Sequence, residues 1–491
     1  MQEAYQKNTP YVQGLLRLMK IGRRYPRPIP GDDIRPGIME DMSKYILKMV
    51  FAHVAPRGAL YKVSAVFANG EEFKNFDSGK PDIKVIFKTR WAQWRSIIFL
   101  PIGLFDAYID GTVDIEGENP IHKLAILGHA AGVDEQGKWS FLAINPFVKL
   151  KHKWCEWTQD NIVRERAIHN AEFHYSQPVE LFKYMLGETI GYSEGYWTPK
   201  TANINQAKHN LYEYICQKLQ LKPGMKVLEV GSGWGFLPIY MVKNYDVDVV
   251  VYNPTKEQNE FMQKRFEKYG VADRIRIEFG VHDDIVKEGK GVFDRFVSIG
   301  VHEHHGMNKK LYKSWWHSIH EVLKDRGIGV ISTSSFMDYR MTGWLTLKYI
   351  WPGGHIPCVP MEITTLDRAG FTLIEWENLW PHYYRTLKLW RDRFKHYWPQ
   401  IHASNPKAFD ENFRRRWTMY LEGVPETFER SLDNSHFIFV KGRYVDGYPK
   451  TLEGRYLKAN FKEGDDIVEC FPMDDEAVPS PIWADAVEKV V

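Results

Sequence analysis

A glycine-rich turn at residues 227–235 is the strongest chemical signal in the sequence. It reads Val-Leu-Glu-Val-Gly-Ser-Gly-Trp-Gly, an apolar run typical of a buried strand, followed by glycines that open a helix. Glycine lets the backbone approach a ligand closely, and a helix N-terminus offers free N–H groups. The third glycine is one residue too early for the dinucleotide-binding fingerprint, and Phe236 stands where that fingerprint has glycine. The turn therefore predicts a different ligand site, with another nucleotide site or a structural turn as alternatives.

The turn resembles motif I of the S-adenosylmethionine-dependent methyltransferases, which carries an acid two residues before its first glycine. On this resemblance the first part of a cofactor site comprises Glu229, Gly231, Gly233 and Gly235. The following strand should present ribose-binding groups at its C-terminal end, where the chain has Asn253, Thr255 and Gln258. No carboxylate is among them, but these polar side chains can also hydrogen-bond ribose hydroxyls. For adenine, the resemblance points to His282 or Asp283, with a solvent-facing loop as the alternative.

Four more segments, read together with the glycine turn, point to one family. They are Tyr-Ser-Glu-Gly-Tyr-Trp at 192–197, the stretch 293–304, Tyr-Ile-Trp-Pro-Gly-Gly at 349–354 and His-Tyr-Tyr-Arg-Thr-Leu at 382–387. In this order and spacing, residues 60–443 resemble the cyclopropane fatty acid synthases and the related mycolic acid methyltransferases. The resemblance adds Tyr192 and Ser193 to the cofactor site and implies S-adenosylmethionine as the cofactor. It also implies that a cis alkene attacks the sulfonium methyl, and that the resulting carbocation loses a proton and closes a cyclopropane ring.

In the family that proton is taken by a bicarbonate ion held by a Cys, a Glu, a His and a Tyr. The Glu falls on Glu303 and the Tyr on Tyr383, but Glu194 replaces the Cys and Ser332 replaces the His. A second carboxylate would repel bicarbonate, because like charges close together in a dry pocket are costly. We expect Glu194 to be the general base itself in place of bicarbonate, with bicarbonate kept as an alternative second cofactor. The alternative is an exposed glutamate, paired with an arginine, in an ordinary turn.

A relocated base leaves the product open. The carbocation can lose its proton from the new methyl, giving a cyclopropane, or from a neighbouring carbon, giving a methyl- or methylene-branched chain. Three histidines, His302, His304 and His305, surround Glu303. We interpret them as groups that orient this carboxylate by hydrogen bonding rather than as metal ligands, because no matching ligand cluster is identifiable elsewhere.

The elements that must position these residues alternate from residue 203 onward. Helices are expected at 206–219, from 235 and at 256–269, and strands at 226–230, 247–252, 294–300 and 327–333. This alternation predicts an α/β fold with a parallel sheet, and the resemblance makes it a Rossmann-like, seven-stranded class I methyltransferase domain. Strand-like runs at 61–67 and 83–88 predict a smaller N-terminal α+β domain. We expect a docking domain at 1–155, the catalytic domain at 156–443 and an acidic, loosely attached tail at 444–491.

Composition supports a globular protein, and a net charge of only +3 argues against nucleic acid as a partner. The 17 Trp and 26 Tyr suit contact with lipid headgroups or a cation, or simply an aromatic core. The basic, aromatic stretch 151–170, with Trp154 and Trp157, is a connector or a lipid-contacting surface. The partner implied by the resemblance is an unsaturated phospholipid bilayer, so we expect a cytoplasmic protein bound peripherally to the inner face of the membrane. A homodimer, a methyltransferase for another substrate and a non-catalytic lipid-binding scaffold remain alternatives.

Overall fold

The computed structural model describes residues 38–100, 102–132, 150, 153–154, 157–305, 309–340 and 342–443. The acidic tail expected at 444–491 lies outside these residues. The chain divides into two compact units. Among the described residues, the first unit comprises those within 1–159, 342–352 and 409–426, and the second comprises those within 160–341, 353–408 and 427–491. Two stretches that come late in the sequence thus belong to the N-terminal unit.

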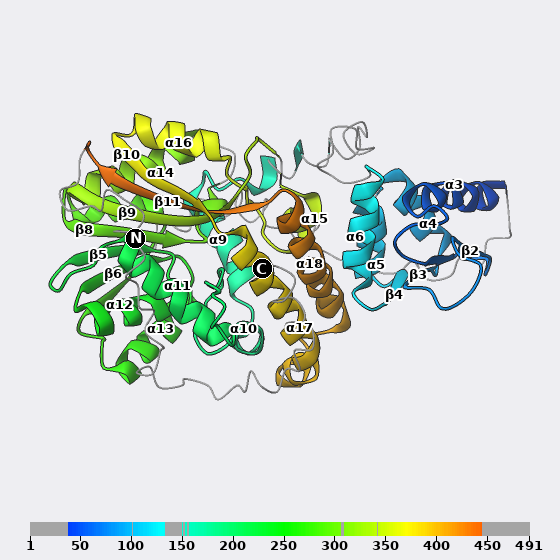
Figure 1. Cartoon of the computed structure of the whole chain (residues 1–491), viewed down its shortest axis with the longest axis horizontal. Helices are drawn as coiled ribbons and strands as arrows, with labels where there is room; N and C mark the ends of the chain where they lie inside the picture. The colour runs from blue at the N-terminus through cyan, green and yellow to red at the C-terminus, as the bar shows by residue number, and fades with distance from the viewer. Residues whose placement is uncertain are drawn as a thin grey trace, which may run out of the picture. The chain divides into compact units, whose positions relative to one another are not determined.

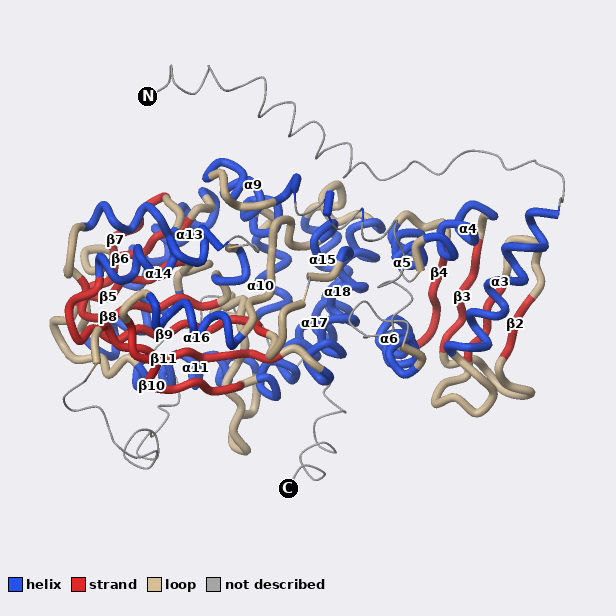
Figure 2. The backbone as a smooth tube through the Cα atoms, turned by 90° about the horizontal axis from the view of Figure 1, so that it is seen from above, coloured by secondary structure: helices blue, strands red, loops and turns tan. Residues whose placement is uncertain are grey.

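The first unit is a small α+β structure, as the sequence predicts. Its sheet has the order β2-β1-β3-β4, in which only the β1–β3 pair is parallel. The strands are β1 (Val63–Val66), β2 (Glu72–Lys74), β3 (Ile83–Phe87) and β4 (Val113–Gly117). They lie side by side in Figure 2. Its helices are α3 (Ile38–Val54), α4 (Arg90–Ile98), α5 (Ile102–Ile109), α6 (Pro120–Ala130), α15 (Trp344–Tyr349) and most of α18 (Glu411–Arg430).

The second unit is built on a seven-stranded sheet with the order β10-β11-β9-β8-β5-β6-β7. Strands β9 to β7 are parallel, and β11 is antiparallel to both of its neighbours. The strands are β5 (Lys226–Val230), β6 (Asp248–Asn253), β7 (Ile275–Phe279), β8 (Phe293–Ile299), β9 (Leu323–Ser335), β10 (Phe371–Asn378) and β11 (Asp433–Lys441). The Rossmann-like sheet expected from the sequence is therefore present.

Helices cover both faces of this sheet, because parallel strands bury apolar residues on both sides. Figure 1 shows α11, α12 and α13 on one face and α14 and α16 on the other. Each group packs a separate apolar core, with Leu211 and Phe266 in the first and Trp315 and Trp316 in the second. The helices are α9 (Arg164–Tyr175), α10 (Val179–Leu186), α11 (Ile204–Lys218), α12 (Phe236–Tyr245), α13 (Lys256–Tyr269), α14 (Lys309–Val322), α16 (Val359–Arg368) and α17 (Trp380–Ser404), with short 3-10 turns η1 (His282–Glu288) and η2 (His302–His304).

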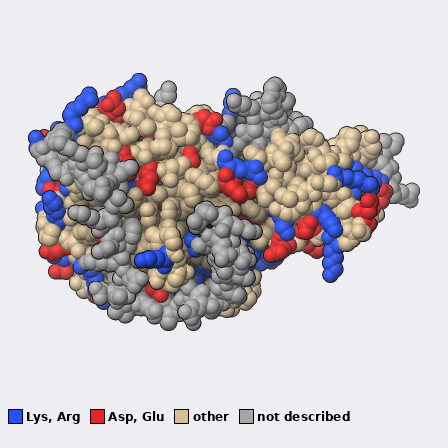
Figure 3. All heavy atoms as spheres, in the orientation of Figure 1, with Lys and Arg blue, Asp and Glu red and all other residues tan. Residues whose placement is uncertain are grey.

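The surface carries both signs of charge. On the face seen in Figure 3, Lys and Arg side chains lie interspersed with Asp and Glu. Among the described residues, no helix has the length and apolar character needed to span a membrane.

Candidate active site

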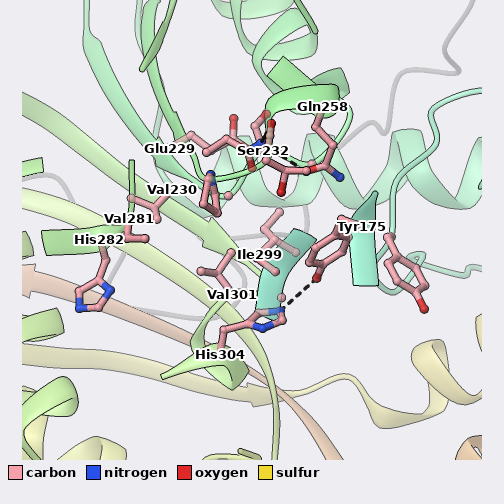
Figure 4. Close-up of a pocket in the computed structure, with 18 of the residues that line it drawn as sticks. Tyr175, Glu229, Val230, Ser232, Gln258, Val281, His282, Ile299, Val301 and His304 are labelled. Atoms are coloured by element: carbon pink, nitrogen blue, oxygen red, sulfur yellow. Dashed lines mark hydrogen bonds between the residues drawn. The ribbon is translucent and has the colours of Figure 1, made fainter. Parts of the chain in front are cut away.

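A pocket lies beside the glycine turn, at the end where the parallel strands β5, β6 and β8 finish (Figure 4). Ligands of open α/β sheets bind at this edge, beyond the carboxyl ends of the strands. All ten residues that the sequence assigns to the cofactor site line this pocket, namely Tyr192, Ser193, Glu229, Gly231, Gly233, Gly235, Asn253, Thr255, Gln258 and His282. Segments far apart in the sequence thus meet in one cavity.

The glycine turn has the backbone conformation that requires glycine. Gly231, Gly233 and Gly235 all have positive φ, at 79°, 58° and 80°. A side chain at Gly231 would collide with Val301, and a Cβ at Gly235 would lie 2.6 Å from Met262 Cγ. A Cβ at Gly233 would meet nothing within 4 Å, so this glycine keeps one wall of the pocket open.

The polar atoms of the pocket suit S-adenosylmethionine. Among the described residues, Glu229 Oε2 and Thr255 Oγ1 are buried without a hydrogen-bond partner, which is rare unless a ligand supplies one. Burial raises the pKa of Glu229 to about 8, with the Ser232 hydroxyl opposing the shift. A cofactor that carries hydroxyl donors and positive charge would satisfy this carboxyl group. The residues present therefore fit the cofactor that the sequence predicts.

The expected ribose and adenine residues are held in place by their neighbours. Asn253 Nδ2 lies 3.2 Å from Gln258 Oε1, so the two side chains orient each other. His282 Nε2 lies 3.2 Å from Asp283 Oδ1 and 3.1 Å from Ser314 Oγ. The hydrogen bond from His282 lowers the pKa of Asp283 to about 2. His282 and Asp283 both line the pocket.

Glu194 is buried beside Ser332, and the exposed glutamate considered as an alternative is not what the structure contains. Only 1% of Glu194 is exposed, and its Oε1 lies 2.9 Å from Ser332 Oγ and 2.7 Å from His436 Nε2. Burial by itself would raise the pKa of Glu194. The hydrogen bond and charge of His436, with Lys208 and Ser332, outweigh burial and lower it to about 2. Glu194 is thus held as a carboxylate.

Glu303 has the opposite environment. It lies in η2, directly after β8, and its Oε1 accepts a hydrogen bond of 2.7 Å from the Ser334 backbone N–H. Burial raises the pKa of Glu303, and its Oε2 has no hydrogen-bond partner among the described residues. Both carboxyl groups therefore accept a hydrogen bond from the end of β9, Glu194 from Ser332 and Glu303 from Ser334. Their pKa values are nevertheless shifted in opposite directions. Two carboxyl groups can share a site when their environments separate them in this way.

The histidines around Glu303 bond other groups than the sequence analysis expects. His302 Nε2 lies 2.7 Å from Glu362 Oε2, and the ring nitrogen Nδ1 of His305 bonds the His302 carbonyl. His304 Nε2 lies 3.1 Å from the Tyr175 hydroxyl, as the dashed line in Figure 4 shows. The prediction that these side chains orient Glu303 is wrong for His302, which is engaged by a carboxylate of α16. Within the described ranges, no group of three His, Cys, Asp or Glu side chains could hold a metal ion.

Long-range hydrogen bonds fix the segment that carries Glu194. The ammonium of Lys208, in α11, lies 2.8 Å from the Glu194 carbonyl oxygen, and Thr386 of α17 accepts from the Gly195 N–H at 2.9 Å. Tyr383, one helical turn before Thr386, is buried, and its ring contacts Trp390. Trp390 in turn contacts the ring of Tyr192, which lines the pocket. Tyr383 is thus linked through Trp390 to Tyr192 in the pocket wall, and Glu194 directly follows Ser193 of the same wall.

His436 is the functional candidate that sequence reasoning missed. It lies on β11, far from every motif, and bonds Glu194 only because β11 pairs with β9, where His436 is opposite Ser332. A single histidine in an apolar strand is an ordinary core residue by pattern. The available signal was Ser332 itself, since it stands where the family resemblance of the sequence would place a histidine.

The sheet order, the glycine turn and the pocket define a class I S-adenosylmethionine-dependent methyltransferase. Residues 163–437 match the family described as mycolic acid cyclopropane synthetase, and the chain belongs to this family.

Curated relatives and solved structures agree with this assignment. The cyclopropane-fatty-acyl-phospholipid synthase of Escherichia coli K12 is 34% identical over 282 residues, which is 57% of this chain and 69% of that protein. A probable fatty acid methyltransferase of Pseudomonas putida is 28% identical over 58% of this chain and 72% of its own length. The solved cyclopropane synthase MmaA2 of Mycobacterium tuberculosis is 26% identical, with a TM-score of 0.51 over 56% of this chain and 98% of that one. The mycolic acid cyclopropane synthase CmaA1, complexed with SAH and CTAB, has the same TM-score at 27% identity, over 56% and 98% of the two chains.

Proposed function

We propose that the protein adds a one-carbon unit from S-adenosylmethionine to the cis double bond of unsaturated phospholipid acyl chains, forming cyclopropane fatty acids. The relatives named for fatty acyl phospholipid and mycolic acid cyclopropanation support this substrate class. A methyl- or methylene-branched product would follow from the same carbocation if a chain carbon lost the proton instead.

Glu194 is proposed as the base, and the observation that carries this proposal is its burial as a carboxylate between Ser332 and His436. The cofactor supplies an electrophilic methyl group. Transfer of this methyl to the alkene would leave a carbocation in the acyl chain. Glu194 then takes a proton from the new methyl, and the electron pair of that C–H bond closes the ring. A pKa of about 2 is sufficient for Glu194, because a carbocation is a far stronger acid than a carboxylic acid.

Bicarbonate has no role in this proposal. The negative charge that bicarbonate would bring is already present in Glu194, and Glu303 is shifted towards its neutral form by burial. An additional anion beside Glu194 would be repelled in so buried a place. In this proposal the fixed carboxylate also stabilises the developing cation.

Docking on a bilayer is proposed for the first unit. On α3, Met42, Tyr45 and Met49 are exposed by 44%, 64% and 53%, and their spacing puts them on one side of the helix. Trp154 and Trp157, which the sequence marks as a connector or a lipid-contacting surface, are also exposed. Methionine and aromatic rings on the surface suit insertion at the level of lipid headgroups. The inner face of the cytoplasmic membrane, where both substrates would be available, is the proposed location.

The test is an incubation of purified protein with labelled S-adenosylmethionine and liposomes of a cis-monounsaturated phosphatidylethanolamine, with bicarbonate removed. A gain of one CH₂ per acyl chain, with a cyclopropane signal in the NMR spectrum, supports the proposal. An exomethylene signal would show the branch route instead. Turnover that requires added bicarbonate would remove Glu194 as the base, and no lipid product in either condition would overturn the substrate class.

A further inference from the structure

The two ring nitrogens of His436 face groups of opposite type. Nε2 lies 2.7 Å from Glu194 Oε1, and a carboxylate oxygen can only accept a hydrogen bond. Nδ1 lies 3.0 Å from Nζ of Lys218, and an ammonium can only donate. Both contacts are made together only when the ring carries one proton, on Nε2, and accepts at Nδ1. The hydrogen bonds therefore define His436 as a neutral imidazole that donates to Glu194.

Lys218 remains an ammonium although its side chain is fully buried. Burial lowers its pKa, but Glu377 of β10 raises it by its charge and by accepting a hydrogen bond of 2.5 Å at Oε2. The Tyr214 hydroxyl donates to the same oxygen at 2.9 Å, and Nζ lies 4.2 Å from the centre of the Tyr214 ring. A carboxylate, an imidazole nitrogen and an aromatic ring thus surround the cation, as the burial of a charge requires.

The charge of Lys218 opposes a second proton on His436. Burial lowers the pKa of His436, and the charge of Lys218 lowers it further. Glu194, through its hydrogen bond and charge, and Glu377, through its charge, raise it. His382, whose own pKa is lowered to about 4 mainly by burial, adds no charge at neutral pH. The ring is therefore neutral at pH 7, and its charge acts on Glu194 only in acid, where the second proton binds.

A neutral ring leaves Glu194 with its full negative charge. Both side-chain hydrogen bonds that its carboxylate accepts from the described residues end on Oε1, from Ser332 at 2.9 Å and from His436 at 2.7 Å. This leaves Oε2 to take the proton in the proposed reaction. An imidazolium in the same place would cancel much of the field of the carboxylate, because opposite charges so close together in a buried site interact strongly. A cation that develops nearby would then be stabilised less.

We propose that Lys218 is a positioning residue, which keeps His436 a neutral Nε2–H donor so that the full charge of Glu194 acts on the cationic reaction centre. This inference rests on the proposed function, in which Glu194 is the base. Lys218 is not among the described residues that line the cofactor pocket, and it acts through the ring of His436. Four ionisable groups in a row cost desolvation that apolar side chains of similar size would avoid, so stability alone does not account for them.

The protonation of His436 is measured directly by NMR on protein with ¹⁵N-labelled histidine, because protonated and unprotonated ring nitrogens differ widely in chemical shift. The signals of His436 are those that disappear in His436→Gln. In wild type at pH 7, Nε2 should be protonated and Nδ1 unprotonated. In Lys218→Met, both nitrogens should be protonated, because Glu194 and Glu377 then attract a second proton unopposed. A charged ring or a proton on Nδ1 in wild type would overturn the proposal, as would a neutral ring in Lys218→Met.

Turnover tests the consequence for Glu194. With saturating S-adenosylmethionine and cis-unsaturated phospholipid in liposomes, kcat of Lys218→Met should fall by about tenfold or more at pH 7. It should return towards the wild-type value as the pH rises, because the ring then loses its second proton. Lys218→Arg keeps the charge, and should keep both the neutral ring and most of the activity. A loss of kcat that is equal at every pH would show a purely structural role and overturn the proposal, and so would an unchanged kcat beside a charged ring.

The matched control is Lys441→Met. Lys441 lies on β11, the strand of His436, with 15% of its side chain exposed, and its ammonium donates to the Leu323 carbonyl at 2.9 Å. This variant also removes a largely buried ammonium, but it should leave the signals of His436 and kcat unchanged; altered signals would overturn the specific role of Lys218. Absence of lipid product with wild-type protein would overturn the proposed function, whereas the NMR experiment needs no substrate and still determines the protonation of His436.

Discussion

His436 Nε2 lies 2.7 Å from Glu194 Oε1, although 242 positions separate the two residues in the sequence. Both side chains are almost completely buried, at 0% and 1% exposure. A buried carboxylate is stable only where hydrogen bonds satisfy it, and His436 and Ser332 provide them for Glu194. This contact allows a glutamate to be buried as a carboxylate at position 194, where the family resemblance of the sequence would place a cysteine.

The first prediction concerns Glu194→Gln. The amide keeps the size of the side chain and removes its charge, so kcat should fall by about 10²–10⁴-fold. The affinity for S-adenosylmethionine should change little, because Glu194 does not line the cofactor pocket. The rates are measured by mass spectrometry of the acyl chains, and cofactor binding by calorimetry. A rate near that of wild type would remove Glu194 from the mechanism.

The control for this variant is Glu362→Gln. Glu362 and His302 form another buried pair at 2.7 Å, so this variant also breaks a contact between a buried carboxylate and a histidine. It should lower the thermal stability in a similar way, while kcat per folded molecule falls far less than in Glu194→Gln. An equal loss of kcat in both variants would mean that the rate falls because a buried carboxylate–histidine contact is lost, and not because the base is removed.

Cofactor binding should release a proton from Glu229. Burial raises the pKa of this group to about 8, so in the free protein it is mostly protonated at pH 7. The positive charges of S-adenosylmethionine favour the carboxylate and lower this pKa, so binding at pH 7 should release about one proton. Calorimetry in buffers of different ionisation enthalpy measures this number. Above pH 9 the proton release should vanish, because Glu229 is already ionised in the free protein. In Glu229→Gln it should be absent at every pH. Proton release that persists in this variant would show that the proton does not come from Glu229.

Gly231→Ala should weaken cofactor binding. Gly231 has a φ of 79°, and an added Cβ would collide with Val301 in the wall of the pocket. Gly224 offers a matched control, because it has the same φ of 79° but open space around a Cβ. Both variants should lose about 1 kcal/mol or more of unfolding free energy from the strained backbone. Only Gly231→Ala should also raise the Kd for S-adenosylmethionine by at least about tenfold. Equal Kd values for the two variants would show that the close approach of Gly231 to Val301 does not matter for cofactor binding.

Bilayer docking should depend on the exposed side of α3. Replacing Met42, Tyr45 and Met49 by serine removes apolar area without altering a buried side chain, and liposome binding should weaken by about tenfold or more. Phe279→Ser, on β7, removes a comparably exposed ring from the second unit and should have little effect. Sedimentation with liposomes measures binding, and turnover of detergent-dispersed lipid should stay unchanged in both variants. Normal sedimentation of the triple variant would place the docking surface elsewhere.

The sequence by itself determined the parts of the site that depend on local structure. The strand at 226–230 and the helix at 256–269 have the predicted bounds, because an apolar run and a glycine turn with positive φ allow few conformations. All ten predicted cofactor residues line one pocket for the same reason, since parallel strands bring their carboxyl ends to one edge.

Only the tertiary structure decided the chemistry of the carboxyl groups. Whether Glu194 is exposed or buried, and ionised or neutral, depends on side chains from β9, β11 and α11 that no local pattern connects to it. Glu303 depends on the tertiary structure in the same way, because burial raises its pKa. His302 does too, since its partner Glu362 is 60 residues away in the sequence. The pKa of each group depends on its solvation and on nearby charges, and the strength of both effects depends on burial. These pKa values are therefore determined only once the chain has folded.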